Sequence, residues 1–148
     1  MKKLIFSFLI AVSVISCASN TNVSDFKNKD WKLVDVLIDS RNINFNRKDL
    51  INEKAGDIFT LKLDGQNISG TGAPNRYSAP YTLSGKQNIK VKPLKATQMA
   101  SIWQPEKLKE YEFFIYMQNI STWAIVNNQL EFTSKTDDGR SVKLVFSL

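Results

Sequence analysis

The sequence of 148 residues contains no histidine and a single cysteine. Histidine is the usual general base of enzymes and the commonest metal ligand in proteins. The sequence also lacks the motifs of zinc proteases, serine hydrolases, P-loop proteins and dinucleotide-binding proteins. These absences predict a protein that is not an enzyme and that binds no metal or other cofactor.

The acidic residues do not form a catalytic or metal-binding arrangement either. Glu110 and Glu112 are two apart on an expected helix, so their side chains point to different faces. The run Asp137–Asp138–Gly139 is most simply a turn, and the alternating acidic loop that binds calcium is missing.

The sequence has no apolar run long enough to span a bilayer as a stable helix, since Leu4 to Ile15 is too short. Lys2 and Lys3 precede that run, and Val14-Ile15-Ser16-Cys17 follows it. This order is typical of a bacterial secretory signal that ends in a lipobox. We therefore expect cleavage between Ser16 and Cys17 and a lipid on Cys17. The alternative is an ordinary signal peptide with a coincidental cysteine.

A lipidated Cys17 predicts a protein of the cell envelope. One acyl chain anchors a protein only reversibly, whereas the two or more chains of a bacterial lipoprotein hold it firmly. Ala18 rather than aspartate follows the cysteine, so we expect the outer membrane, on its periplasmic or its surface face.

Charge adds little. Removal of Lys2 and Lys3 with the leader leaves 18 basic and 14 acidic residues, a net charge of +4. Such an excess fits an ordinary solvated surface, although it would also favour anionic lipid heads or polymers. No nucleic-acid recognition motif or dense basic cluster occurs, so we expect no nucleic-acid partner. We expect a monomer whose partners are the membrane, through the lipid on Cys17, and an envelope protein.

The length fits one domain, which divides into a leader (1–16), a Ser/Asn-rich flexible spacer (17–29) and a folded domain (30–148). Runs of alternating apolar and polar residues, bounded by Gly, Pro, Asn and Asp, predict antiparallel strands. We expect them at 30–38, 58–63, 67–72, 77–83, 88–94, 121–126, 130–134 and 141–146, with a short edge segment at 95–100.

The segment 105–119 has helical spacing. Pro105 suits the first helical position and Glu106 adds favourable charge there. We expect the buried face to follow Leu108, Tyr111, Phe114 or Ile115, and Met117 or Gln118. The helix is expected to close an open side or end of the sheet; a membrane helix or a partner-binding helix is the alternative.

The connection 39–57 is long and polar and lacks a strand pattern. We expect it to be mobile or partly helical within 47–55, with Phe45, Leu50 and Ile51 pinning it to the body.

Gly70 and Gly72 would face the same side of a strand and allow a neighbouring backbone or ring to approach closely. They open an ordered series: G-x-G-x-x-N-R-Y, a strand ending at Ser84-Gly85, A-T-Q-M-A, and E-F-x-x-x-M-x-x-I-x-x-W from Glu112. With Trp31-x-Leu33, this series resembles the META domain of HslJ-like bacterial lipoproteins. The resemblance implies a link to envelope stress or drug tolerance without an agreed molecular activity. Family members often have cysteine where this chain has Pro74 and Ser101, so no bridge is carried over.

The fold expected is mainly β (α+β): a curved antiparallel sheet or small barrel of about eight strands packed on one amphipathic helix. Asn75, Arg76, Tyr77 and Trp103 are the candidate ligand or partner surface, although Asn75 and Tyr77 also suit a turn and a packed strand. The function expected is that of a non-enzymatic, lipid-anchored envelope protein. The alternatives are a lipocalin-like carrier of a small apolar ligand, with a cavity lined by Phe59, Tyr81 and Trp123, and an inhibitor or binder of an envelope enzyme.

Overall fold

The structure, a computed structural model, describes residues 24, 26–44, 47, 51–52, 56–100 and 104–148. Its elements are β1 (Trp31–Ile38), β2 (Arg41–Asn42), β3 (Ile51–Asn52), β4 (Gly56–Asp57), β5 (Thr60–Leu63), β6 (Asn67–Thr71), β7 (Arg76–Ser84), β8 (Asn88–Val91), β9 (Lys95–Ala96), α1 (Glu110–Gln118), β10 (Thr122–Val126), β11 (Gln129–Lys135) and β12 (Ser141–Ser147).

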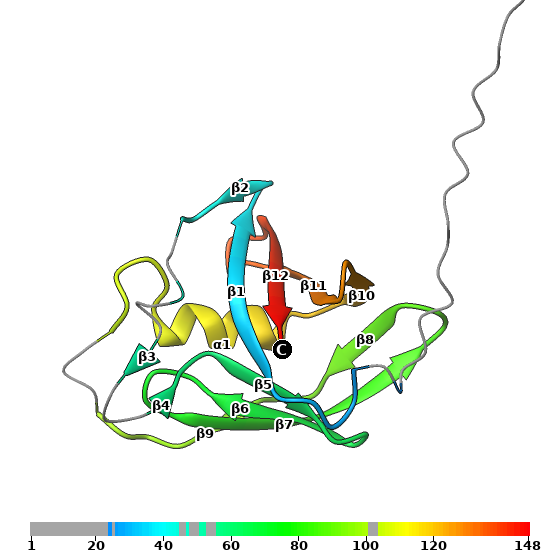
Figure 1. The fold of residues 1–148 in the computed structure, drawn as a ribbon, viewed down its shortest axis with the longest axis horizontal. Coiled ribbons are helices and arrows are strands. Elements are labelled where there is room, and N and C mark those ends of the chain that lie inside the picture. The colour runs from blue at the N-terminus through cyan, green and yellow to red at the C-terminus, as the bar shows by residue number, and fades with distance from the viewer. Residues whose placement is uncertain (1–23, 25, 45–46, 48–50, 53–55, 101–103) are drawn as a thin grey trace, which may run out of the picture.

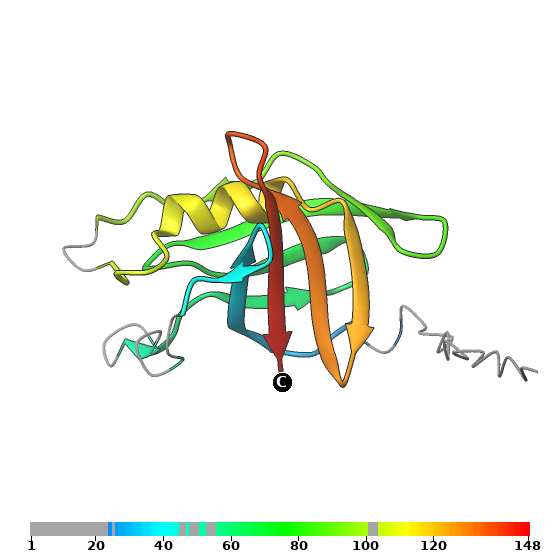
Figure 2. The same ribbon diagram turned by 90° about the horizontal axis from the view of Figure 1, so that it is seen from above.

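Eight of the strands form a closed antiparallel barrel (Figures 1 and 2). The order β12-β11-β10-β8-β7-β6-β5-β1 closes because β1 also pairs with β12. Closure leaves no unpaired edge within this ring. The short strands β2 and β9 attach to β1 and β7, and β3 pairs with β4 in a separate hairpin. The predicted fold class, a small barrel of about eight strands with one helix, is confirmed.

The tight turns follow from residues that tolerate positive φ. Gly65, at φ 101°, follows Asp64, whose carboxylate accepts hydrogen bonds from the backbone of Gln66 (2.8 Å) and Asn67 (2.6 Å). Asn127 and Asn128, at φ 50° and 62°, form the turn between β10 and β11. Asparagine and glycine adopt this left-handed region at little cost, so these turns fix the strand pairing on either side.

The barrel interior is filled with apolar side chains. Alternate residues of β7 and β8 point inward, as the sequence pattern predicts. Rings dominate the packing: Phe132 contacts Phe146 with ring centroids 5.9 Å apart. The largest buried side chains are Trp31, Phe26, Phe59, Phe113, Phe132, Phe146, Leu33, Ile58, Leu61, Leu63 and Ile68.

β1 departs from simple alternation. Its pairing with β12 shifts between Leu33 and Asp35, which is a β-bulge. Before the bulge Trp31 and Leu33 are buried, and after it the next buried residue is Val36. Strict alternation would have placed Asp35 on the same face as Trp31 and Leu33, but the extra residue of the bulge reverses the faces of the side chains that follow it.

α1 begins at Glu110, five residues later than predicted, so Pro105 is not its first residue. Lys109 is the N-cap, and Glu112 accepts a hydrogen bond from the Lys109 backbone N–H (2.8 Å). The buried residues of the helix are Phe113, Tyr116 and Met117, whereas Tyr111 is 65% exposed. The prediction that placed Tyr111 on the buried face is wrong, because aromatic residues occur all around this helix and the spacing alone does not select a face.

α1 lies across one end of the barrel (Figures 1 and 2). Its Phe113 ring packs on Phe59 (4.8 Å between centroids) and on Tyr77 (5.6 Å). The side chain of Gln118 accepts a hydrogen bond from the Leu94 backbone N–H (2.6 Å), which joins the helix to the connection between β8 and β9. The expected role of the helix, closing an open end of the sheet, is what these contacts perform. No helix in the described ranges is both long enough and apolar enough to cross a bilayer.

Phe26 packs near the other end of the barrel. It is fully buried, its ring lies 4.5 Å from that of Trp123, and its carbonyl accepts a hydrogen bond from the Trp31 indole (2.9 Å). The backbone N–H of Asn28 donates to Leu63 at the end of β5 (2.7 Å). The later part of the segment predicted as a flexible spacer thus contributes to the core.

As far as it is described, the connection 39–57 contains short strands, and Arg47, within the segment expected to be partly helical, has 3-10 helical conformation. β2 folds back on β1, and β3 pairs with β4. Arg47 holds this connection to the barrel: it donates to the Leu33 carbonyl (2.8 Å), and its guanidinium lies 3.4 Å from the Asp57 carboxylate. The expected contributions of Phe45, Leu50 and the Ile51 side chain lie outside what the structure describes.

Candidate functional site

The structure divides the triplet Asn75-Arg76-Tyr77 between the interior and the surface. Asn75 is 7% exposed and Tyr77 is 3% exposed, whereas Arg76 is exposed. Tyr77 donates its hydroxyl hydrogen bond to the Thr60 carbonyl (2.8 Å), and burial raises the pKa of its phenol. Only Arg76 is thus presented to a partner. Ser16, Cys17 and Trp103 lie outside the described residues.

The Asn75 side chain joins three segments of the chain. Its oxygen accepts hydrogen bonds from the Met99 backbone N–H (2.6 Å) and from the Thr97 hydroxyl (2.8 Å). Its amide nitrogen donates to the Met99 carbonyl (3.2 Å) and to Glu110 Oε2 (2.7 Å). All its hydrogen-bonding capacity is used within the fold, so Asn75 is a structural residue.

Glu110, at the first turn of α1, completes this network. Its Oε1 accepts hydrogen bonds from the backbone N–H groups of Ala73 and Asn75, the latter at 2.6 Å. Gln104 bridges the same groups, because it donates to the Ala73 carbonyl and accepts from the Glu110 backbone N–H (2.9 Å). We call Gly72, Ala73, Asn75, Gln104 and Glu110 the Glu110 clasp.

Two glycines make room for the clasp and its neighbours. A Cβ on Gly72 would lie 2.6 Å from Glu110 Oε1 and 2.7 Å from the Phe114 ring. A Cβ on Gly70 would lie 2.0 Å from the Thr60 carbonyl oxygen and 2.9 Å from the Tyr77 ring. The expected close approach of a backbone or a ring is present at both glycines: the Thr60 backbone and the Tyr77 ring at Gly70, and the Phe114 ring at Gly72.

Sequence reasoning missed Glu110 as a partner of Asn75. The only available signal was that Glu110 and Glu112 would occupy different helix faces. They do: Glu112 bonds the helix N-terminus, whereas Glu110 bonds a loop 35 residues earlier in the chain. A contact over that separation leaves no local pattern.

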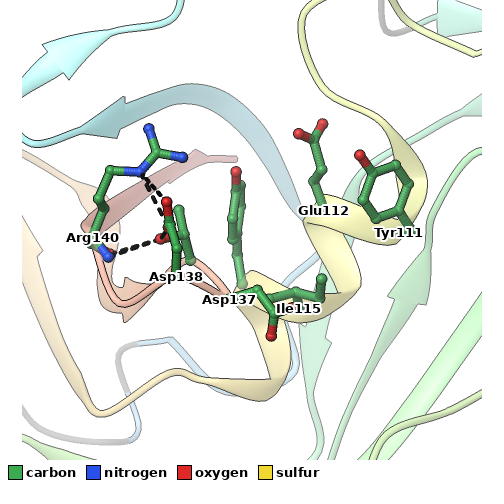
Figure 3. Close-up of a pocket in the computed structure, with 8 residues that line it drawn as sticks. Tyr111, Glu112, Ile115, Asp137, Asp138 and Arg140 are labelled. Carbon is green, nitrogen blue, oxygen red and sulfur yellow. Dashed lines mark hydrogen bonds and ion pairs between the residues drawn. The ribbon is translucent and has the colours of Figure 1, made fainter.

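A hollow of about 390 Å³ lies between α1 and the β11–β12 turn (Figure 3). Figure 3 shows Tyr111 and Glu112 on the helix, facing Asp138 and Arg140 on the turn. We call it the helix–turn hollow. Its lining comprises Tyr111, Glu112, Ile115, Tyr116, Thr136, Asp137, Asp138 and Arg140.

The charges of the helix–turn hollow are partly paired. Arg140 Nε donates to both oxygens of Asp138 (3.1 and 3.0 Å), and Thr136 donates to the same carboxylate. The hydrogen bond from Thr136 and then that from Arg140 lower the pKa of Asp138. Burial, followed by the nearby Glu112 carboxylate, raises the pKa of the Tyr116 hydroxyl. With Asp138 and Arg140 paired, Glu112 and Asp137 give the hollow a negative balance.

Two further hollows of about 320 Å³ each lie on the surface. One runs over β5 and β6 beside Arg76, and the other lies between Leu94 and the second half of α1. Among the residues that the structure describes, no three His, Cys, Asp or Glu side chains lie close enough together to hold a metal ion.

Comparison with known proteins agrees with the barrel geometry. The META domain matches residues 24–145. Among solved structures, an NMR structure of a protein from Burkholderia xenovorans is similar over 99% of both chains, with a TM-score of 0.54 and 18% identity, which supports a shared fold. No match is found among curated proteins. Because the match covers the barrel and its helix, the chain belongs to the META domain family.

Proposed function

We propose that this META-domain protein is a non-enzymatic, lipid-anchored protein of the cell envelope that binds a partner protein through the helix–turn hollow. The observation that carries the proposal is that the barrel interior and the Glu110 carboxylate are both occupied by contacts within the fold. The barrel core is filled with apolar side chains, and the Glu110 carboxylate is engaged by three hydrogen bonds within the fold. Binding is therefore left to the outer surface.

The packed interior is the reason to prefer this proposal over a carrier. Phe59, Tyr81 and Trp123, which would line a ligand cavity, are at most 6% exposed. Phe59 packs on the helix and Trp123 packs on Phe26, so their rings contact other side chains. A lipocalin-like ligand would have to displace one of these rings.

The helix–turn hollow has features of a partner site. Tyr111 is 65% exposed beside a depression with a negative balance of charge. Exposed tyrosines are enriched in protein interfaces because they offer a large apolar area together with a polar hydroxyl. The hollow fits a partner segment that presents a basic side chain beside an apolar one.

The lipid anchor is tested by metabolic labelling with a fatty acid. The wild-type protein is expected to incorporate the label and to sediment with membranes, and Cys17→Ala to lose both properties. Ser16→Ala keeps a small residue before the cysteine and is the control that should retain them. Label and membrane association that persist in Cys17→Ala would contradict the anchor.

The partner surface is tested by affinity capture from envelope extract with the chain from Ala18 onward. We expect wild type to retain a protein that Tyr111→Ala retains much less. Leu148→Ala is the matched control, because Leu148 is similarly exposed (63%) at the C-terminus. An empty capture, or equal capture by the Tyr111 variant, would contradict a partner at the hollow.

The family resemblance suggests the physiological setting, envelope stress or drug tolerance. A deletion strain is expected to be more sensitive to envelope-active compounds, and wild-type protein but not Tyr111→Ala should restore tolerance. Unchanged sensitivity in the deletion strain would remove this part of the proposal.

A further inference from the structure

The strands β6 to β9 bring basic residues together on the outside of the barrel. The stretch 65–105, which contains these strands, has five basic residues and no aspartate or glutamate. In Figure 1 the strands form the lower layer of the barrel, away from β11 and β12. The positive charge of this stretch is thus placed on one side of the barrel by the pairing of its strands.

Strand register determines which side chains share this face. In β8, Ile89 and Val91 are buried, so the exposed Lys90 points outward, and Lys92 follows the same alternation. Lys95 of β9 pairs with Ser78 of β7, which is also exposed. We call Arg76, Lys90, Lys92 and Lys95 the basic face.

The cations of the basic face are not neutralised by the neighbouring strands. None of the four side chains forms an ion pair with another described residue. The exposed β7 residues between them are Ser78, Pro80, Thr82 and Ser84. Asp30 lines the same hollow as Arg76 but pairs with Lys62 of β5 at 3.3 Å, and Glu110, beside Asn75, is engaged by the loop before β7. The face is therefore free to meet an external anion.

The chain enters the described barrel close to these strands. Asn28 bonds to Leu63 at the end of β5, and Gln66 in the following turn accepts a hydrogen bond from Tyr81 of β7 (3.0 Å). Ser24, the first described residue, is seven residues from Cys17. Seven residues span at most about 25 Å, so a lipid on Cys17 would hold this end of the barrel near the bilayer.

We propose that the basic face docks on the anionic headgroups of the membrane that holds the lipid anchor. This inference rests on the proposed anchoring at Cys17. Lysine and arginine near an anionic bilayer are attracted over about a Debye length, roughly 8 Å at physiological salt. The tether keeps the face at a high effective concentration, which favours docking even when the contact alone is weak. Docking leaves the helix–turn hollow, on α1 and the β11–β12 turn, accessible to a partner.

The experiment uses the chain from Ala18 onward, which lacks the lipid and keeps the whole described core from Phe26. Its sedimentation is measured with vesicles of phosphatidylglycerol and phosphatidylethanolamine, and with vesicles of phosphatidylcholine. We expect binding to the anionic vesicles only, lost at high salt. Lys90→Glu/Lys92→Glu is expected to weaken binding at least about tenfold.

The matched control is Lys107→Glu/Lys135→Glu, which changes the net charge equally with exposed lysines outside the basic face. It should bind nearly as well as wild type. Lys90→Gln/Lys92→Gln, expected to lose binding in part, separates loss of attraction from added repulsion. Circular dichroism verifies that each variant is folded.

Three results would overturn docking: no binding to anionic vesicles, equal binding to phosphatidylcholine, or an equal loss in the control variant. Because the protein used carries no lipid, the outcome is independent of acylation. Vesicle binding without fatty-acid label on Cys17 would support membrane docking of the basic face and contradict the proposed lipid anchor. Fatty-acid label without vesicle binding would contradict docking of the basic face and leave the proposed anchor unaffected.

Discussion

The Glu110 side chain connects the first turn of α1 to the loop before β7. Both its oxygens accept hydrogen bonds from the loop that leads into β7, two of them from backbone N–H groups. Backbone donors that lose their acceptor in a partly buried loop are costly, because water reaches them poorly. The clasp therefore fixes both the start of β7 and the start of α1.

Replacement of Glu110 by alanine is expected to lower the free energy of unfolding by about 2 kcal/mol or more, since three donors lose their acceptor. Glu106→Ala is the control, because that side chain is 89% exposed, and it should change stability by less than about 0.5 kcal/mol. Urea denaturation measures both. Equal stability of the two variants would contradict the structural role of the clasp.

Asp57 makes stability depend on acid. The hydrogen bond from Lys32, more than the nearby Arg47, lowers its pKa below the ordinary 3.8. A lowered folded-state pKa stabilises the fold above the unfolded value, and this contribution is lost as pH falls through the folded value. Asp57→Asn is thus expected to reduce stability slightly at neutral pH, by less than about 1 kcal/mol, and not at all well below pH 3.8.

Thermal unfolding from neutral pH to strongly acidic pH tests this expectation. The difference between wild type and Asp57→Asn should shrink as pH falls below 3.8. A difference that is constant over the whole range would show that the carboxylate charge does not contribute. Asp35, whose pKa is raised by burial, acts in the opposite direction and is left unchanged in both proteins.

At the scale of elements, glycines in β6 and directly after it allow neighbouring groups to pack closely against this strand. At Gly70 the ring of Tyr77 crosses β6 to reach the Thr60 carbonyl on β5, and at Gly72 the clasp and Phe114 fill the space. These contacts differ in what lies opposite. Backbone faces Gly70, whereas the ends of side chains face Gly72.

Alanine at Gly70 is therefore expected to be the more damaging change, because the Thr60 backbone cannot move without disturbing its pairing with Lys32 of β1. We expect a loss of more than about 3 kcal/mol at Gly70 and about 1–3 kcal/mol at Gly72. Denaturation midpoints measure the order. The reverse order would contradict the assigned contacts.

The segment before β1 is also an element of the fold. Phe26→Ala is expected to cost about 3–5 kcal/mol, since its ring is fully buried against Trp123. A chain that begins at residue 30 should melt at a lower temperature than one that begins at residue 24. Equal melting temperatures would show that residues 24–29 do not stabilise the fold, as expected for the flexible spacer that the sequence predicts.

For the whole molecule, local patterns predicted most of the barrel. Local features depend only on residues close together in the sequence and could be predicted from it. They include the alternation in β7 and β8, the Asp64–Gly65 turn and the Asn127–Asn128 turn. The start of α1 could not be predicted in this way, because Glu110 is placed by a loop distant in sequence. The outward Tyr111 and the bulge in β1 likewise follow from packing between strands and helix.

The candidate surfaces show the same division. The sequence drew attention to Asn75, Arg76 and Tyr77, but packing buries two of them and leaves Arg76 on the basic face. The absence of acidic residues from 65–105 is a sequence signal for the basic face, but its extent depends on the register of β7, β8 and β9. The helix–turn hollow has no such signal, because α1 and the β11–β12 turn are separate in sequence. Closure of the barrel brings them together.

The proposed function depends most on the chemical state of Cys17, and mass spectrometry of the N-terminal peptide of the mature, membrane-derived protein tests that state directly. The expected peptide begins at Cys17 and carries a diacylglyceryl group on the sulfur. A mature peptide that begins elsewhere, or an unmodified Cys17, would contradict the lipid-anchored function.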